Sequence, residues 1–124
     1  MAGFDAQCSG PVFAEILAEP RLMPLGPGKP NQPLRSKLAD LTPESAFAHA
    51  RLADREMAQA CIAGVWLYHD FLDESHTISQ KLQSTTGSYW HGIMHRREPD
   101  YANAKYWFDR VSEHPIFADR KSVV

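Results

Sequence analysis

The fold is decided by residues 57–72, which read MAQACIAGVWLYHDFL. This stretch is apolar nearly all round, as expected of a helix buried at the centre of a helical protein. Asp54 stands before it as an N-cap, so the helix is expected to run from Arg55 onward. The same pattern predicts that Trp66, Leu67 and Phe71 are buried in the core.

The sequence leaves two alternatives for the end of this helix. An apolar residue recurs at intervals of four, seven and four positions, in Leu67, Phe71, Ile78 and Leu82. These residues share one stripe if the helix continues to Leu82. Alternatively, the helix breaks near Asp73, because Asp73 could cap a new helix.

Two shorter helices are expected before this stretch. One covers residues 11–19 and ends at Pro20. The other begins at Thr42-Pro43-Glu44, where a threonine cap, a proline at the first helical position and an acid near the positive helix end coincide. It is expected to run to about Leu52.

Two helices are expected after it. Residues 85–88 are predicted to form a turn, and Ser88 caps a helix over residues 89–97 that Pro99 stops. A last helix, over residues 100–112, carries on one side Tyr101, Ala104, Phe108 and Val111. No alternating run indicates a strand. The sequence therefore predicts an all-α fold, a small helical bundle with short connections in its second half.

Residues 20–33 contain five prolines and two glycines, which exclude a persistent helix or central strand. We expect a proline-rich extended arm or linker. A ligand for a partner's aromatic groove is less favoured, because no clean P-x-x-P motif with a basic anchor is present. The expected organisation is an N-terminal segment with this arm (residues 1–41), a helical domain (42–117) and a C-terminal tail (118–124).

Charge and composition exclude several classes of function. A net charge of -2 over 124 residues argues against nucleic-acid binding, which needs a basic surface. No apolar run is long enough to cross a bilayer, and no membrane partner is expected. No phosphate-loop or dinucleotide motif is present, so no nucleotide cofactor is implied. Two cysteines without metal or redox spacing, and no export signal, predict a cytoplasmic protein.

The polar chemistry gathers in two triplets with the spacing i, i+4, i+7: His69, Asp73 and His76, and then His91, His95 and Glu98. On a helix each triplet falls within about 60°, so its three side chains face one way. Two imidazoles and a carboxylate suit a divalent transition metal such as zinc, iron or manganese. Helical bundles build metal sites from ligands on facing helices.

Basic residues beside aromatic ones could bind a small anionic substrate: Arg96, Arg97 and Lys105. The alternative is that the bases pair with interleaved acids, for example Arg97 with Glu98 or Asp100. The histidines, too, could be structural, because single pairs at this spacing are common. Two hypotheses follow: a metal-dependent enzyme acting on a small anionic molecule, or a non-enzymatic helical protein-interaction module with structural histidines.

Two segments are long enough to carry a resemblance, YHDFLDESH at residues 68–76 and YWHGIMHRREPDY at 89–101, which NAKYWF at 103–108 continues. Both resemble stretches of a family of uncharacterised proteins in bacteria and fungi. The resemblance covers roughly residues 55–117. It implies no activity and no catalytic residue, and it indicates only that the two segments belong together.

Overall fold

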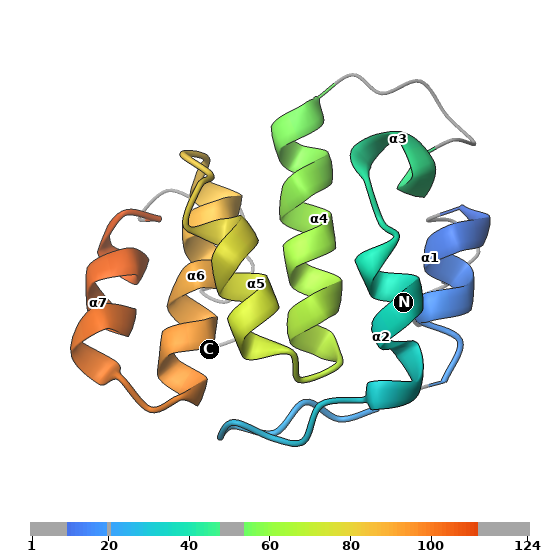
Figure 1. Cartoon of the computed structure of the whole chain (residues 1–124). Coiled ribbons are helices and arrows are strands. Elements are labelled where there is room, and N and C mark those ends of the chain that lie inside the picture. Colours follow the sequence, from blue (N-terminus) through green and yellow to red (C-terminus); the bar gives the residue numbers. More distant parts are fainter. Residues whose placement is uncertain (1–9, 20, 48–53, 112–124) are drawn as a thin grey trace, which may run out of the picture.

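The computed structural model describes residues 10–19, 21–47 and 54–111. Within these ranges the chain forms helices and no strand, which confirms the all-α prediction (Figure 1). The elements are α1 (Pro11–Ile16), η2 (Gln32–Leu34), α2 (Arg35–Ala39), α3 (Pro43–Ala46), α4 (Arg55–Tyr68), α5 (Leu72–Ser79), α6 (Thr85–Arg97) and α7 (Tyr101–Asp109). None of the helices in these ranges has the length and apolar character needed to cross a membrane.

The central helix is α4, with α1–α3 on one side and α5–α7 on the other (Figure 1). The Asp54 side chain caps it by accepting a hydrogen bond of 3.0 Å from the backbone N–H of Met57. Trp66, Leu67 and Phe71 are 6%, 0% and 1% exposed, which confirms their prediction as core residues. Because α4 has neighbours on both sides, it needs the nearly uniform apolar surface that its sequence provides.

The predicted continuation of this helix to Leu82 is wrong, and the alternative of a break is confirmed. The helix ends at Tyr68, and three residues separate it from α5, which begins at Leu72. Asp70 lies between them with a φ of 69°, the left-handed conformation that Asp tolerates better than most residues. The break falls slightly earlier than the sequence indicated, and Asp73 lies inside the first turn of α5.

Helix α6 begins earlier than predicted. Ser84, rather than Ser88, is its cap and accepts a 3.1 Å hydrogen bond from the N–H of Gly87, so residues 85–88 form the first helical turn. The backbone N–H groups of residues 83 and 84 are held by Glu56 of α4. The predicted end of α6 at Arg97 is confirmed.

Helix α7 starts after Asp100, which accepts a hydrogen bond from the N–H of Asn103. Ala104 and Val111 are buried as predicted, but Tyr101 is 63% exposed, so the expected apolar stripe is shorter. In the first half of the chain, Thr42 and Ser45 form a capping box at the start of α3. This helix ends at Ala46, and residues 48–52 of the predicted helix lie outside the described residues.

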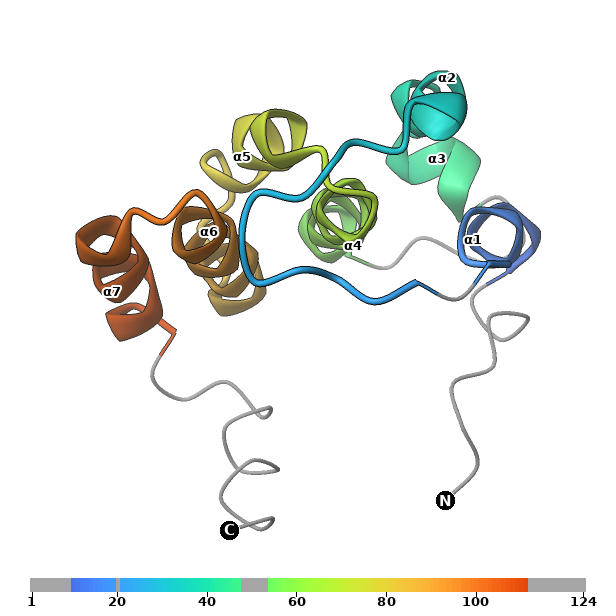
Figure 2. The same cartoon turned by 90° about the horizontal axis from the view of Figure 1, so that it is seen from below.

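The proline-rich arm, residues 21–31, has no helix or strand, as predicted, although Pro33 belongs to the short turn η2. Figure 2 shows the arm crossing the end of α4 to reach α6 and then returning to α2. Arg96 and Arg97 at the end of α6 donate hydrogen bonds to the carbonyl groups of Leu25, Gly26 and Pro27. The arm is therefore part of the packed structure.

A buried ion pair fixes the point where the arm, the α4–α5 turn and α6 meet. One carboxylate oxygen of Asp70 lies 2.6 Å from Nη2 of Arg97, and the other lies 2.6 Å from Nη2 of Arg21. The side chains of Asp70 and Arg97 are each only 3% exposed. Arg97 also donates a 2.8 Å hydrogen bond to the Leu67 carbonyl at the end of α4. Buried charges need such complete pairing.

We predict that Leu67→Ala lowers the free energy of unfolding by about 2–5 kcal/mol, because it removes a fully buried side chain from the central helix. Met57→Ala on the same helix is the matched control, since Met57 is 41% exposed. Urea unfolding of both variants is the measurement. A loss below about 0.5 kcal/mol for Leu67→Ala would contradict the assigned core.

We predict that Asp70→Asn costs about 3–5 kcal/mol, because it leaves Arg97 charged and unpaired in the interior. Asparagine tolerates the left-handed backbone, so the variant removes the charge with little added strain. Asp109→Asn, which removes an exposed ion pair with Lys105, should cost less than about 1 kcal/mol. Urea unfolding measures both variants. Equal losses in the free energy of unfolding would show that the buried ion pair stabilises the protein no more than the exposed one.

Candidate metal centre

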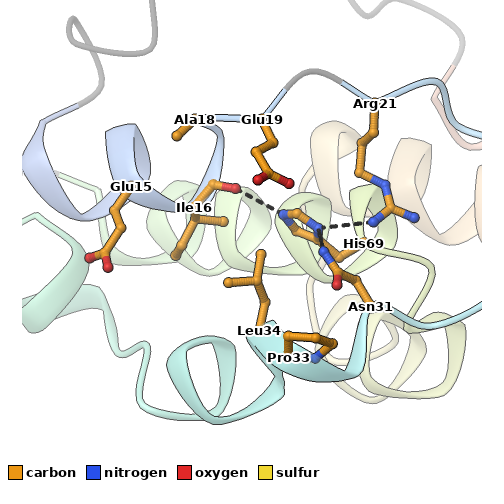
Figure 3. Close-up of a pocket in the computed structure, with 9 residues that line it drawn as sticks. All are labelled: Glu15, Ile16, Ala18, Glu19, Arg21, Asn31, Pro33, Leu34 and His69. Carbon is orange, nitrogen blue, oxygen red and sulfur yellow. Dashed lines mark hydrogen bonds between the residues drawn. The ribbon is translucent and has the colours of Figure 1, made fainter.

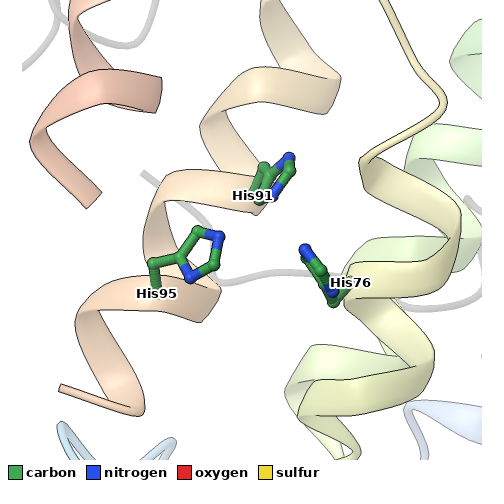
Figure 4. A group of neighbouring side chains, drawn as sticks. All are labelled: His76, His91 and His95. Atoms are coloured by element: carbon green, nitrogen blue, oxygen red, sulfur yellow. The ribbon is translucent and has the colours of Figure 1, made fainter. Parts of the chain in front are cut away.

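Three of the predicted ligands come together between α5 and α6: His76, His91 and His95 (Figure 4). The centroid of the His76 ring lies 4.8 Å from that of His91 and 5.2 Å from that of His95. The rings of His91 and His95 are 4.8 Å apart, one helical turn apart on α6. One nitrogen from each ring can be chosen so that all three lie within 4.8 Å of one another.

His91 is the most enclosed member of this histidine cluster, at 2% exposed. Its ring stacks on Trp107 of α7 at 3.8 Å between centroids, with 17° between the planes. On α6, His95 stacks against it at 26°. Stacking uses the faces of a ring, whereas a metal or a hydrogen bond approaches a ring nitrogen in the plane. Both nitrogens of His91 are buried and have no hydrogen-bond partner among the described residues.

Electrostatics keep His91 neutral at physiological pH. Burial, together with the nearby imidazoles of His76 and His95, lowers the pKa of His91 from 6.5 to about 4. A neutral imidazole is the form that ligates metals. His91 is therefore in the state that a metal ligand requires.

His95 is oriented by Glu98, the third member of its predicted triplet. Its Nδ1–H donates to a Glu98 carboxylate oxygen at 2.6 Å. This bond occupies Nδ1 and leaves Nε2 as the nitrogen available to a metal. Carboxylate–histidine pairs of this kind commonly support metal ligands in proteins. His95, Glu98 and Asp100 also form a second, more exposed group of potential ligands.

The structure does not bring His69 into the cluster. The turn at Asp70 separates His69 from α5, which corrects the prediction that His69, Asp73 and His76 share one helical face. His69 instead lines a cavity between α1 and the arm, where its Nε2–H donates to the carbonyl of Ile16 at 3.0 Å (Figure 3). Its Nδ1 accepts from Asn31 at 3.2 Å, and burial lowers its pKa. His69 is a hydrogen-bonded core histidine.

Asp73 also lies outside the cluster. It is exposed on the first turn of α5 and lines a second cavity together with Glu74 and Glu98. The structure therefore brings together one residue of the first triplet, His76, and the two histidines of the second, while Glu98 bonds to His95. The convergence of two complete triplets, which their equal spacing suggested, does not occur.

The three basic residues predicted to bind an anion have other contacts. Arg97 is 3% exposed on its side chain and makes four hydrogen bonds, to Asp70 and to the carbonyl groups of Gly26, Pro27 and Leu67. This corrects its assignment to a substrate site, and its partner is neither Glu98 nor Asp100. Arg96 donates to the carbonyl of Leu25, and Lys105 pairs with Asp109 on the surface of α7.

Sequence alone did not connect Trp107 with the histidines, because the contact depends on how α7 packs against α6. The nearest signal is Gly92 in α6, where a Cβ atom would lie 2.8 Å from the ring of Phe108. A glycine next to His91 thus allows the close approach of α7. Asp70, the residue that redirects the chain, also gave no signal in the spacing of polar residues.

Comparison with known protein families, with curated proteins and with solved structures gave no match. Three imidazoles from two helices, one of them hydrogen-bonded to a carboxylate, form a group that could hold a metal ion.

We predict that the metal-free protein loses stability as the pH falls from about 6.5 to about 4. In this window the unfolded chain protonates His91 while the folded chain does not, so protons favour unfolding. His91→Phe keeps a flat ring on Trp107 but cannot titrate, and its stability should change less over this window. Urea unfolding at several pH values, with a chelator present, measures the difference. Identical pH dependence in both proteins would contradict the depressed pKa of His91.

Proposed function

We propose that His76, His91 and His95 bind a divalent transition metal, zinc foremost, and that the protein is a metal-dependent enzyme acting on a small anionic substrate. The observation that carries the proposal is that both nitrogens of His91 are buried without a partner among the described residues, while one nitrogen from each of the three imidazoles lies within 4.8 Å of the others. Buried polar atoms without a partner are rare in native proteins, and each calls for an explanation.

The distances are compatible with coordination after a small adjustment. Zinc–nitrogen bonds of about 2.0–2.1 Å in a tetrahedral site separate the ligand nitrogens by about 3.3 Å. In the cluster the nitrogens lie within 4.8 Å of one another, so they must approach by up to about 1.5 Å, and the stacked rings of His91 and His95 must turn to direct both nitrogens at one ion. His91 and His95 stand one helical turn apart, the spacing at which paired histidines on a helix chelate zinc.

The composition of the donor set favours zinc over the other two metals expected. Manganese prefers oxygen ligands, and non-haem iron sites usually combine two histidines with a carboxylate. Here the group of three close imidazoles contains no carboxylate, and the Glu98 carboxylate beside His95 is engaged with the ring Nδ1–H. Its place in the second coordination shell would orient His95 and increase its basicity.

Three protein ligands leave a coordination position open. Structural zinc sites are usually closed by four ligands and often contain cysteine, whereas catalytic zinc sites use three ligands and a water molecule. A metal in such a site lowers the pKa of its bound water and polarises a substrate oxygen. The metal would then supply the positive charge that binds an anionic substrate. Arg97 cannot supply it, because it is paired with Asp70.

A second candidate is the interaction module with structural histidines. The observation in its favour is on α7, where Tyr101 and Tyr106 are 63% and 54% exposed. The guanidinium of Arg110 lies 5.9 Å from the Tyr106 ring and 5.2 Å from the Trp107 ring. Exposed aromatic residues next to arginine are enriched in protein interfaces. This surface could exist beside a metal centre, so the two candidates are separated by metal content.

We predict that protein purified without chelators contains about one equivalent of zinc or another transition metal. His91→Ala and His95→Ala should lose it, because each removes one of three ligands. Glu98→Gln should keep the metal but bind it about 10–100 times more weakly, as expected for a residue that supports a ligand. Elemental analysis and competition with a chelator measure content and affinity.

Asp73→Asn is the matched control, since Asp73 lies on α5 one turn before His76 and outside the cluster. It should retain the metal in full. The proposal fails if the wild-type protein contains no metal and no added zinc, iron or manganese ion raises its melting temperature. Full metal content in His91→Ala and His95→Ala would place the metal elsewhere.

A further inference from the structure

We infer that the open position of this centre selects small monovalent anions, bound directly to the metal, over divalent anions such as sulfate. The inference rests on the proposed function and specifies its substrate class. It follows from the charges that surround the three histidines, the enclosure of the cluster, and the absence of a free arginine beside it among the described residues.

The first step concerns the ligands. All three are imidazoles, which coordinate as neutral groups, so they leave the charge of a divalent ion undiminished. The ion is then the largest positive charge in its surroundings. An anion that reaches the open position replaces water and lowers the charge of the centre.

The second step concerns the neighbouring acids. Glu98 bonds to His95, and Asp100 lies in the same group of potential ligand atoms, all within 4.8 Å of one another. Two carboxylates offset the charge of the ion in the wider surroundings. With a monoanion bound, the ion, the two carboxylates and the anion together carry a net charge near minus one. With a dianion bound, the net charge is near minus two, and this larger charge in a partly buried place costs more free energy. Arg110, the base nearest to Trp107, is exposed, and solvent screens its charge.

The third step concerns size and access. His91 is 2% exposed and is covered by the stacked ring of Trp107, so a ligand cannot approach from the α7 side. His76 is only partly buried, and the Glu98 side chain is 37% exposed. The more accessible side of the cluster is therefore that of His76, which extends from α5 toward His91 and His95 (Figure 4). With His76 and the partly exposed Glu98 carboxylate on this side, a compact anion should enter more readily than a bulky or highly charged one.

The test uses the full-length protein loaded with cobalt(II), whose visible absorption reports changes in its coordination sphere. Azide, formate and sulfate are titrated at constant ionic strength. Azide and formate should change the spectrum with saturation, and sulfate should need at least about a tenfold higher concentration. Sulfate binding as tightly as formate, or no spectral response to azide and formate, would overturn the inference.

Two variants change the charge in opposite directions. Glu98→Gln removes a negative charge without removing a ligand, and it should tighten formate binding and reduce the discrimination against sulfate. His76→Asp keeps a ligand at the more accessible position but makes it anionic, and it should weaken formate binding by at least about tenfold. Unchanged formate affinity in both variants would contradict the charge argument.

The inference and the proposed function fail in different ways. If wild-type protein binds no cobalt, the metal centre itself is absent. If it binds one equivalent, loses it in His91→Ala, and yet shows no preference for monoanions, the centre stands and only the substrate class is wrong. Should His76→Asp not retain cobalt, Glu98→Gln alone still decides the charge argument.

Discussion

The rest of the structure depends on the carboxylate of Asp70, which binds two arginines in the interior. Arg97 brings the end of α6 to it, and Arg21 brings the start of the arm. Because Asp70 follows α4 directly and adopts a positive φ, the same residue ends the central helix and reverses the chain into α5. One ionised group thus joins segments from three parts of the sequence. Arg97 is buried with Asp70, whereas the side chain of Arg21 is 24% exposed. The cost of burying Arg97 is offset further by carbonyl groups, including that of Leu67 at the negative end of α4.

This turn also determines which histidines can meet. On one continuous helix, His69 and His76 would face the same way. The reversal at Asp70 leaves His69 beside α1 and the arm, fully hydrogen-bonded, and directs His76 of α5 toward α6. Two histidines seven residues apart consequently have different roles, one in the packing of the arm and one in the cluster. The ion pair on Arg97 then fixes the end of α6 that carries His95, close to the turn from which α5 emerges.

Local signals in the sequence predicted the helices well where caps and prolines are explicit. Asp54 and Thr42 begin helices as their side-chain chemistry requires, and Leu67 is buried as the apolar stretch predicted. The start of α6 was misplaced because Ser84 and Ser88 are both competent caps, and the choice depends on Glu56, distant in sequence. The histidine spacing predicted that the two whole triplets converge, but only His76 of the first triplet lies beside His91 and His95. The sequence could not reveal the partners of Arg97. Two of its hydrogen bonds join residues that are 71 and 70 positions away, and a third joins Asp70 in the buried turn.

Among the described residues, most buried side-chain nitrogens without a hydrogen-bond partner lie in the histidine cluster. Around Asp70 most of the packed polar groups find partners: His69 uses both nitrogens, Arg97 makes four hydrogen bonds, and Ser75 donates to the carbonyl of Ala63. The exception there is Nε of Arg21. Among the described residues only three buried side-chain nitrogens lack a partner, and His91 has two of them. Stability alone would favour an apolar ring at this position, since Trp107 stacks equally well on phenylalanine and no desolvation cost would remain. A buried histidine with two unpartnered nitrogens therefore costs stability, and the proposed metal ion is a partner that the three imidazoles could share.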